Sequence, residues 1–184
     1  MVREKEEMFI RFSKKTDESQ IRELIRLCFG YGDHCGAFKN LNGRYLLAFD
    51  DEDNLIGMTG LIWCKEYNGY EVDWTCTHPN YREMGIMHEL FKRICSLTDE
   101  NIFCSCWRLQ DKEQPNLHSL MKDFGFKEVI HTRVTWDTNY NCHSGQSYYC
   151  AAEPSHVEHG TLVKSPCRCY EDLYLRKGLR TNKS

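Results

Sequence analysis

The sequence predicts an α+β domain, a three-layer α/β arrangement in which helices cover both faces of a mixed, mainly antiparallel sheet. Short runs of alternating apolar residues are separated by Gly, Asn and Asp, which is typical of strands. Apolar residues at helical spacing lie between several of these runs. Near the middle of the chain a single helix separates two consecutive strands, and such a connection requires a parallel, splayed strand pair in the otherwise antiparallel sheet.

Length and composition favour one domain spanning residues 1–184, because 184 residues with 41% hydrophobic content supply a single sizeable core. The net charge of −3 and the scattered basic residues argue against a nucleic-acid partner. No apolar run reaches 18 residues and the first seven residues are mostly charged, so we expect a cytoplasmic protein without a membrane partner. Eleven cysteines without a secretion signal argue against a disulfide framework.

The first half of the chain is expected to be strand-rich. Strands are predicted at 9–12, 45–50, 55–67 and 70–77, with a helix from Asp17 to Gly30 and a short helix near Gly36. Residues 51–54 form a polar turn between two of these strands. Asn68 and Gly69 predict a two-residue hairpin turn, because both residue types tolerate positive φ.

The second half alternates helices and strands. Helices are predicted from Gly85 to Leu97 and from Pro115 to Gly125, and strands at 102–109, 126–137 and 170–176. Residues 138–169 have no apolar period and are rich in Asn, Ser, Gly, His and Cys. We expect them to form a Cys/His-rich loop insertion without secondary structure, folded over the substrate site.

The segment from Tyr70 to Leu90 carries the strongest functional signal. A strand runs into a short loop and then into a helix N-terminus, where unpaired backbone N–H groups and the helix dipole favour bound phosphate. Glycine at position 85 removes the Cβ that would keep a diphosphate from the backbone, and Arg82 adds a cation. The loop is therefore predicted to bind an anion.

Within this segment, "HPNYREMGIM" resembles the acyl-CoA loop of the GNAT N-acetyltransferase superfamily, whose pattern is Gln or Arg, two residues, Gly, one residue, Gly or Ala. Arg82 and Gly85 match, whereas Met87 departs from the last position. "NLHSLMKDFGF" is similar to the family's helix ending in Gly-Phe, and the element order agrees over residues 9–137. The resemblance implies a GNAT-like fold with the splayed strand pair at the cofactor site, and acetyl transfer from acetyl-CoA to a primary amine.

The resemblance also implies site residues. The backbone of residues 75–77 would pair with the pantetheine arm, and residues 83–88 would enclose the pyrophosphate. An asparagine that often contacts the cofactor in this family aligns with Gln114, and Asn116 lies two positions away. The implied cofactor-binding residues are Thr75, Cys76, Thr77, Arg82, Glu83, Met84, Gly85, Ile86, Met87, His88 and Asn116.

A lysine-like amine with a pKa of about 10.4 must lose a proton before it attacks a thioester. Glu71 lies eleven positions before Arg82, a spacing similar to that of the catalytic glutamate in the histone acetyltransferase branch, so the resemblance implies Glu71 as general base. Asp73 is two residues further on the same strand face and shares or replaces that role. A rival mechanism makes Cys76 an acylated nucleophile beside His78, although a buried strand cysteine is more common.

Several alternatives stay open. The family's usual tyrosine acid is replaced by Met121, which leaves Tyr148, Tyr149, Tyr170 and Tyr174 as candidate acids. Four cysteines of the insertion suit structural zinc, or else are free thiols: Cys142, Cys150, Cys167 and Cys169. The alternative to an acetyltransferase is a non-catalytic module on the same fold, which binds acyl-CoA or is a zinc-stabilised interaction module. The amine acceptor, small molecule or peptide, is not identified, and edge strands are compatible with a homodimer.

Overall fold

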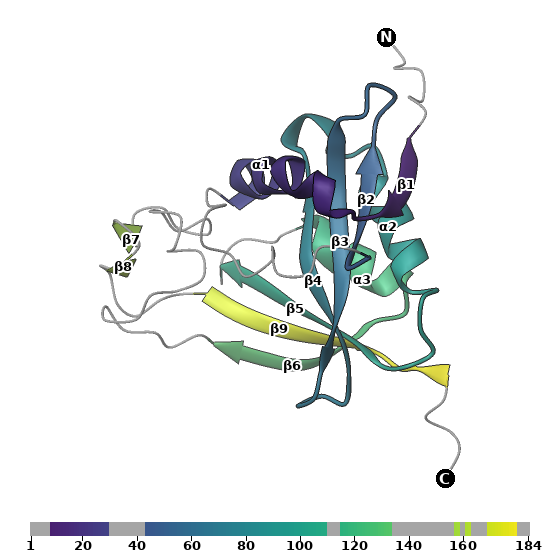
Figure 1. The fold of residues 1–184 in the computed structure, drawn as a ribbon. Helices are drawn as coiled ribbons and strands as arrows, with labels where there is room; N and C mark the ends of the chain where they lie inside the picture. The colour runs from purple at the N-terminus through teal and green to yellow at the C-terminus, as the bar shows by residue number, and fades with distance from the viewer. Residues whose placement is uncertain are drawn as a thin grey trace.

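A computed structural model describes residues 8–29, 43–109, 115–133, 157–158, 161–162 and 169–179 of the chain. Seven strands form one sheet in the order β1-β2-β3-β4-β5-β9-β6, and a separate ladder joins β7 and β8 (Figure 1). The strands are β1 (Phe9–Phe12), β2 (Tyr45–Phe49), β3 (Leu55–Cys64), β4 (Gly69–Thr77), β5 (Ile102–Leu109), β6 (Lys127–Arg133), β7 (Val157–Glu158), β8 (Thr161–Leu162) and β9 (Cys169–Arg176). The helices are α1 (Glu18–Phe29), α2 (Ile86–Ile94) and α3 (Pro115–Asp123), with short 3-10 turns η1 (Lys15–Asp17) and η3 (Pro79–Tyr81).

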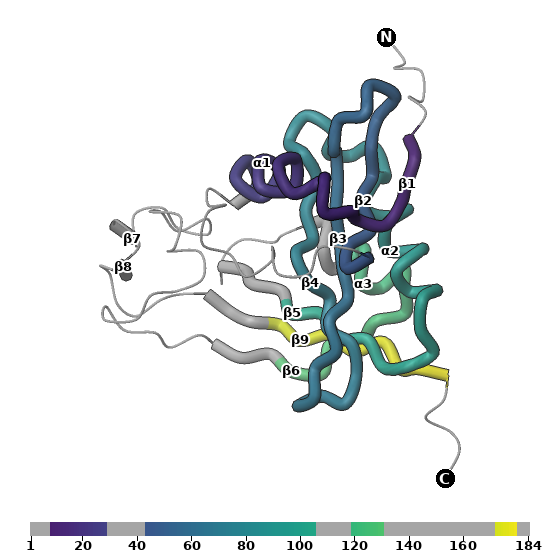
Figure 2. Tube along the Cα trace, viewed as in Figure 1, coloured from purple at the N-terminus to yellow at the C-terminus, as the bar shows by residue number. Residues whose placement is uncertain are grey.

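The sheet consists of two halves that meet at β4 and β5. Strands β1 to β4 pair antiparallel in sequence order, and β5, β9 and β6 pair antiparallel with one another (Figure 2). The two halves are joined by a parallel pairing of β4 with β5 that covers Tyr70 with Ile102 and Glu71 with Phe103. Beyond this short segment β4 and β5 diverge, as Figure 1 shows. The predicted fold class, including the splayed parallel pair, is confirmed.

Helices cover both faces of the sheet because β2 and its neighbours are apolar on both sides. Tyr45 to Phe49 alternate between the two faces and all five side chains are buried. The α1-side core contains Ile21, Leu24, Ile25, Tyr45, Leu47, Phe49, Leu55, Met58 and Cys76. The α2-side core contains Leu46, Ala48, Ile56, Ile86, Leu90, Phe91, Ile94, Cys95, Ile102, Cys104, Met121, Phe126 and Tyr174. The two cores hold α1 on one face of the sheet and α2 with α3 on the other (Figure 1).

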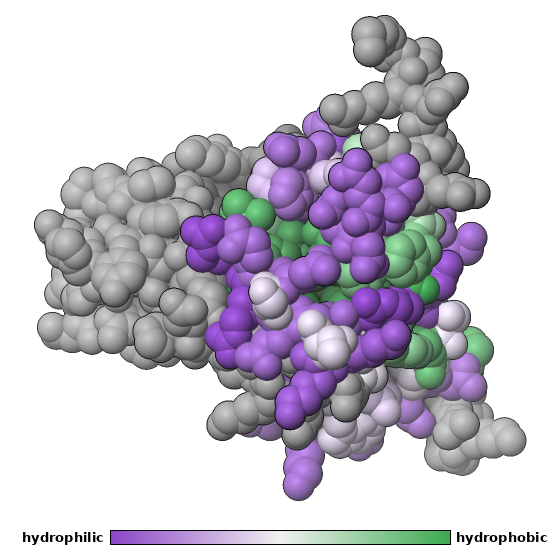
Figure 3. Space-filling view, turned by 45° about the horizontal axis from the view of Figure 1, so that its top comes forward, coloured by the Kyte–Doolittle hydropathy of each residue, from purple (hydrophilic) through white to green (hydrophobic). Residues whose placement is uncertain are grey.

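The face of the described residues that Figure 3 shows is largely polar. In Figure 3 hydrophilic side chains cover most of the coloured surface, and apolar side chains show between them in the middle of the view. Among the described helices, none combines the length and the apolar composition that a membrane crossing requires.

The hairpin between β3 and β4 differs from the predicted two-residue turn. The strands end and resume at the paired residues Cys64 and Gly69, so the turn consists of the four residues 65–68. Asn68 has positive φ, as expected, but Gly69 belongs to the strand. A Cβ on Gly69 would lie 2.8 Å from the carbonyl oxygen of Asn101. The glycine therefore serves close packing against the start of β5 and not turn conformation.

The predicted insertion at 138–169 also requires a correction. The prediction of no secondary structure there is wrong in one place, because β7 and β8 form a small antiparallel ladder, with Val157 opposite Leu162. Strand β9 begins at Cys169, one residue earlier than expected. The short helix predicted near Gly36 and the rest of the insertion lie outside the described residues.

Gly60 in β3 yields a stability prediction. A Cβ at this position would lie 2.6 Å from the ring of Tyr45, whose side chain is fully buried. We expect Gly60→Ala to destabilise the fold by about 1 to 3 kcal/mol, because the ring must shift within a packed core. Chemical denaturation of both proteins measures the difference. Equal stability of the two would show that the ring moves aside without cost.

Candidate active site

Strand β4 is bent where it leaves β5. Between the pairs Met58–Cys76 and Gly60–Asp73, the two residues Trp74 and Thr75 oppose the single residue Thr59. This is a β-bulge, and Trp74 accordingly has a φ of 40°. The hydroxyls of Thr59 and Thr75 lie 2.8 Å apart and hold the two strands together across the bulge. Beyond Glu71, no residue of β4 pairs with β5.

The loop after β4 is fixed to the start of β3 and to the turn before it. The backbone N–H of His78 donates to the carbonyl of Ile56 at 2.8 Å. The Tyr81 hydroxyl, at the end of η3, donates to Asp50 Oδ2 at 2.7 Å. Burial of Asp50 opposes its ionisation, but hydrogen bonds from Tyr81 and Asn54 outweigh this effect and lower its pKa. These contacts position the loop that leads into α2.

The N-terminus of α2 has the geometry of an anion-binding site. Gly85 is the N-cap residue in a left-handed conformation (φ 78°, ψ 6°), and a Cβ placed there would meet no atom within 4 Å. The hydrogen bond from the Glu89 N–H to the Gly85 carbonyl closes the first turn of the helix. The N–H groups of Ile86, Met87 and His88 have no acceptor within the described part of the chain, as expected for the first turn of a helix. Gly85 and His88 are exposed, so a phosphate can approach this turn.

The other predicted loop residues surround this turn. Arg82, Glu83 and Met84 are exposed, and Glu83 has a φ of 67°. Ile86 is buried against Gly57 and Met87 packs on the α2-side core, whereas His88 is exposed, with its ring 4.8 Å from that of Phe124 in α3. Asn116 belongs to the first turn of α3, but its side chain lies outside the described part. The loop thus offers backbone N–H groups and the exposed side chains of Arg82 and His88 to a ligand.

Glu71 and Asp73, the predicted catalytic residues, lie on β4 beside the point where β5 departs. Glu71 is opposite Ile62 of β3 and beside Phe103 of β5, and Asp73 is opposite Gly60. Residues two apart on a strand share a face, so both carboxylates lie on the α1 side of the sheet. Asp73 forms an ion pair with Arg44 at 2.7 Å and accepts a hydrogen bond from the Tyr45 hydroxyl at 2.9 Å.

Two thiols meet at the end of β4. Cys28, near the end of α1, is half-buried and lies 3.3 Å from the Thr77 carbonyl oxygen, to which its S–H donates. A hydrogen bond from Cys76 and the charge of Arg82 lower the pKa of Cys28 against the effect of burial. The same hydrogen bond, together with burial, raises the pKa of Cys76 well above its ordinary value. A thiolate in this pair therefore resides on Cys28.

We expect Cys28 to be alkylated by iodoacetamide before Cys76 and Cys95, since the thiolate is the reacting species. Cys95 is the matched comparison, because burial raises its pKa. Coenzyme A should slow the reaction of Cys28, which lies near Arg82, and leave that of Cys95 unchanged. Peptide mapping by mass spectrometry after timed alkylation measures each rate. Modification of Cys76 or Cys95 ahead of Cys28 would show that the assignment of the thiolate is wrong.

The geometry does not support Cys76 as a nucleophile activated by His78. Strand β4 ends at Thr77, and His78 caps η3, where its Nδ1 accepts a hydrogen bond from the Asn80 N–H at 3.2 Å. Cys76 is 7% exposed, and in the described part of the chain no hydrogen bond joins it to His78. Its raised pKa also disfavours the thiolate.

Of the other predicted site residues, the structure describes some and leaves others outside the described part. Met121, at the position of the family's tyrosine, is fully buried in the α2-side core, and Tyr174 is 4% exposed in the same core. The other candidate acids, Tyr148, Tyr149 and the side chain of Tyr170, lie outside the described residues. So do Cys142, Cys150, Cys167 and the side chain of Cys169. Among the residues that are described, no group of three or more His, Cys, Asp or Glu side chains is arranged to hold a metal ion.

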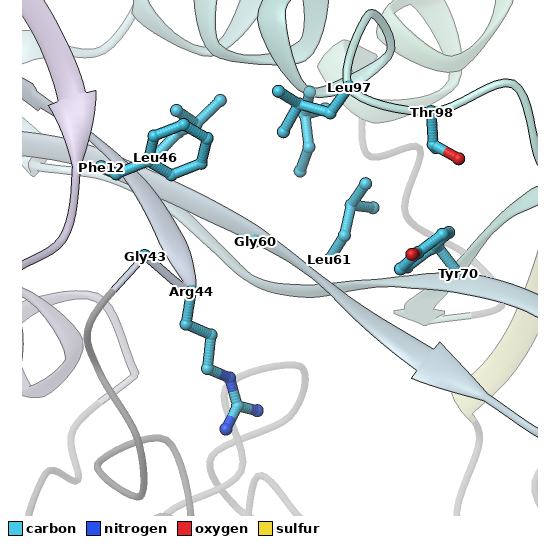
Figure 4. Close-up of a pocket in the computed structure, with 10 residues that line it drawn as sticks. Phe12, Gly43, Arg44, Leu46, Gly60, Leu61, Tyr70, Leu97 and Thr98 are labelled. Atoms are coloured by element: carbon cyan, nitrogen blue, oxygen red, sulfur yellow. The ribbon is translucent and has the colours of Figure 1, made fainter.

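A cavity of about 140 Å³ lies elsewhere, between the sheet and the end of α2. Phe12, Leu46, Leu61 and Leu97 surround it, and Arg44 extends away to the other side of the strands (Figure 4). Helix α2 has nine residues and is about 13 Å long. The cavity is near its C-terminal end and Gly85 is at its N-terminal end, so the cavity is separate from the anion-binding loop.

Sequence reasoning missed four residues that shape this site. Arg44 and Tyr45 bind Asp73, Cys28 binds the Thr77 carbonyl, and Asp50 anchors Tyr81. The partners of these pairs are separated by 28 to 49 residues in the chain. A local pattern carries no signal for such pairs. A strand tyrosine opposite a glycine is the one feature that hints at them.

Comparisons with known proteins identify the family. Residues 8–126 match the model of the Acetyltransferase (GNAT) family, so the chain belongs to this family. No curated protein matches its sequence.

Solved structures agree in fold at low sequence identity. The Escherichia coli ribosomal-protein-S18-alanine N-acetyltransferase has a TM-score of 0.62 at 11% identity, over 97% of this chain and 99% of that one. The Vibrio cholerae spermidine/spermine N-acetyltransferase SpeG has a TM-score of 0.58 at 14% identity, over 92% and 91%. The Neisseria gonorrhoeae N-acetylglutamate synthase, complexed with coenzyme A and N-acetyl-glutamate, has a TM-score of 0.59 at 14% identity, over 95% of this chain and 36% of that one. These likenesses show the fold, and their three acceptors differ.

Proposed function

We propose that this protein is an N-acetyltransferase that transfers the acetyl group of acetyl-CoA to a primary amine. The observation that carries the proposal is the open helix N-terminus at Gly85, which a short loop connects to the strand that leaves β5. A diphosphate fits the N–H groups of Ile86, Met87 and His88 and the cation of Arg82. Membership in the acetyltransferase family makes acetyl-CoA the ligand expected at such a loop.

The unpaired edge of β4 suits the rest of the cofactor. An extended chain with amide groups can pair with a free strand edge as an additional strand would. The backbone of Thr75, Cys76 and Thr77 lies beyond the last β4–β5 pair at Glu71, and within it the Thr77 carbonyl already accepts the Cys28 S–H. The pantetheine arm, which carries two amides, would therefore lie along β4 and lead from the Gly85 loop toward Glu71 and Asp73.

In this proposal the two carboxylates act on the amine. Glu71 receives the proton that the ammonium must lose, directly or through water, and the neutral nitrogen then attacks the thioester carbonyl. Asp73 is the second carboxylate of the same site. The thiolate of coenzyme A is a moderately basic leaving group, which fits a site where a buried methionine replaces the family's tyrosine.

The test is a panel of amines from four classes: peptides with free N-termini, lysine peptides, polyamines and amino acids. Acetylated product should be detected by mass spectrometry, because the eleven cysteines would react with thiol reagents that report coenzyme A release. We expect acetylation of at least one class that depends on acetyl-CoA. Cofactor binding without product from any class would indicate an acyl-CoA-binding module instead.

A further inference from the structure

Asp73 is bound at one oxygen and open at the other. The Arg44 Nη2 donates to Oδ2 at 2.7 Å, and the Tyr45 hydroxyl donates to the same oxygen at 2.9 Å. Oδ1 accepts no hydrogen bond within the described part of the chain. The Asp73 side chain is 16% exposed, so it is neither fully enclosed nor free in solvent. Its orientation is fixed from one side by two donors.

The two donors reach Asp73 across β3 because Gly60 leaves the way open. Tyr45, Gly60 and Asp73 are aligned across β2, β3 and β4. The Tyr45 ring lies over Gly60, where any Cβ would meet it at 2.6 Å. The Arg44 side chain turns to the face of the sheet opposite Leu61 and Leu97, as Figure 4 shows. A glycine, a tyrosine and an arginine thus combine to hold one carboxylate.

This carboxylate is close to Glu71. Residues two apart on a strand are about 7 Å apart along it, and their side chains share a face. The N–H groups of an ammonium placed between two such carboxylates can donate to both. Glu71 is the last residue of β4 that pairs with β5, and Asp73 lies two residues further, where the two strands have separated. The open oxygen Oδ1 is thus available next to the proposed base.

We infer that Asp73 binds and orients the ammonium of the acceptor through Oδ1, and that Tyr45 and Arg44 are positioning residues that act through Asp73. The inference rests on the proposed function and assigns different roles to Glu71 and Asp73. Glu71 takes the proton, whereas Asp73, held by two donors, keeps one orientation and accepts an N–H of the ammonium. The acceptor class is a cationic primary amine that approaches from the α1 side of the sheet.

The experiment compares Asp73→Asn, Tyr45→Phe and the double variant. We expect Asp73→Asn to raise the KM for the amine by roughly 10- to 100-fold, the range for loss of a charged hydrogen bond, with a smaller effect on kcat. Tyr45→Phe should raise KM less. If Tyr45 acts through Asp73, the double variant should be no worse than Asp73→Asn alone. Tyr70→Phe is the matched control, because it also removes a tyrosine hydroxyl. Tyr70 lies on β4, as Asp73 does, but it lines the cavity on the opposite face of the sheet.

Affinity for acetyl-CoA should be equal in all four variants. A lower kcat in Asp73→Asn with unchanged KM would make Asp73 the base and overturn the inference, as would additive effects of the two substitutions on kcat/KM.

Amine binding without turnover separates this inference from the proposed function. Isotope-labelled protein loaded with coenzyme A is titrated with n-butylamine, and the amide resonances of β4 are followed. Saturable shifts that weaken in Asp73→Asn support the inference even if no amine is acetylated. Equal affinity of the wild type and Asp73→Asn, or no binding in either, contradicts it whatever the outcome of the acetylation panel.

Discussion

Replacing Glu71 by Gln should lower turnover by about 10²- to 10⁴-fold and leave acetyl-CoA affinity unchanged, because a positioned general base contributes this much to a proton transfer. The glutamine keeps the size of the side chain but cannot accept the proton of the ammonium. Glu71 is placed for this role at the last residue of β4 that pairs with β5. Single-turnover measurement of acetylated product at saturating acetyl-CoA tests the effect on chemistry directly.

Glu66 provides the control for this substitution. It is exposed in the turn 65–68 at the end of the same hairpin, so Glu66→Gln makes the same chemical change away from the site. We expect wild-type turnover from that variant. Full activity of Glu71→Gln would remove Glu71 from catalysis, and a loss of cofactor affinity in that variant would assign it a binding role instead.

Replacing Gly85 by Ala should weaken acetyl-CoA binding by roughly 10- to 100-fold, the effect of losing one hydrogen bond to a charged phosphate. The added Cβ has no protein atom within 4 Å and would stand where the diphosphate must approach the backbone. The left-handed conformation also costs an alanine about 1 to 2 kcal/mol of stability. Affinity is measured by calorimetry and stability by denaturation of the same samples.

Gly43 separates these two effects. It has a φ of 69° and equally open surroundings, but it lies before β2 and not at the α2 loop. Gly43→Ala should lose a similar amount of stability and bind acetyl-CoA as the wild type does. If both variants bind the cofactor normally, then the space at Gly85 is not the phosphate site.

The elements were predictable from the sequence because their signals are local. Strand β5 has the predicted bounds, and α2 begins one residue after the expected glycine. The family loop was likewise identifiable from Arg82 and Gly85. Gly69 shows the limit of local reasoning, since the dipeptide Asn-Gly indicated a turn while the packing of Asn101 determined where that glycine lies.

The surroundings of the site were not predictable, because they depend on which residues of distant strands become neighbours. Nothing in "RYLLAF" indicates that Arg44 and Tyr45 would reach Asp73, since this requires the register across β3 and a glycine at position 60. The bulge at Trp74 is hidden for a similar reason, as Trp and Thr are ordinary strand residues. The cysteines likewise differ in ways that their neighbours in the sequence do not indicate, since Cys28 is half-buried beside a carbonyl and Cys95 is buried in a core.

Titration of labelled protein with coenzyme A, followed through the backbone amide resonances, tests the central claim most directly. We predict saturable binding with the largest shifts at Ile86, Met87 and His88, and smaller shifts along Thr75 to Thr77. Absence of binding, or binding that leaves these amides unchanged, would contradict the assignment of the α2 N-terminus as the site that holds the acetyl donor.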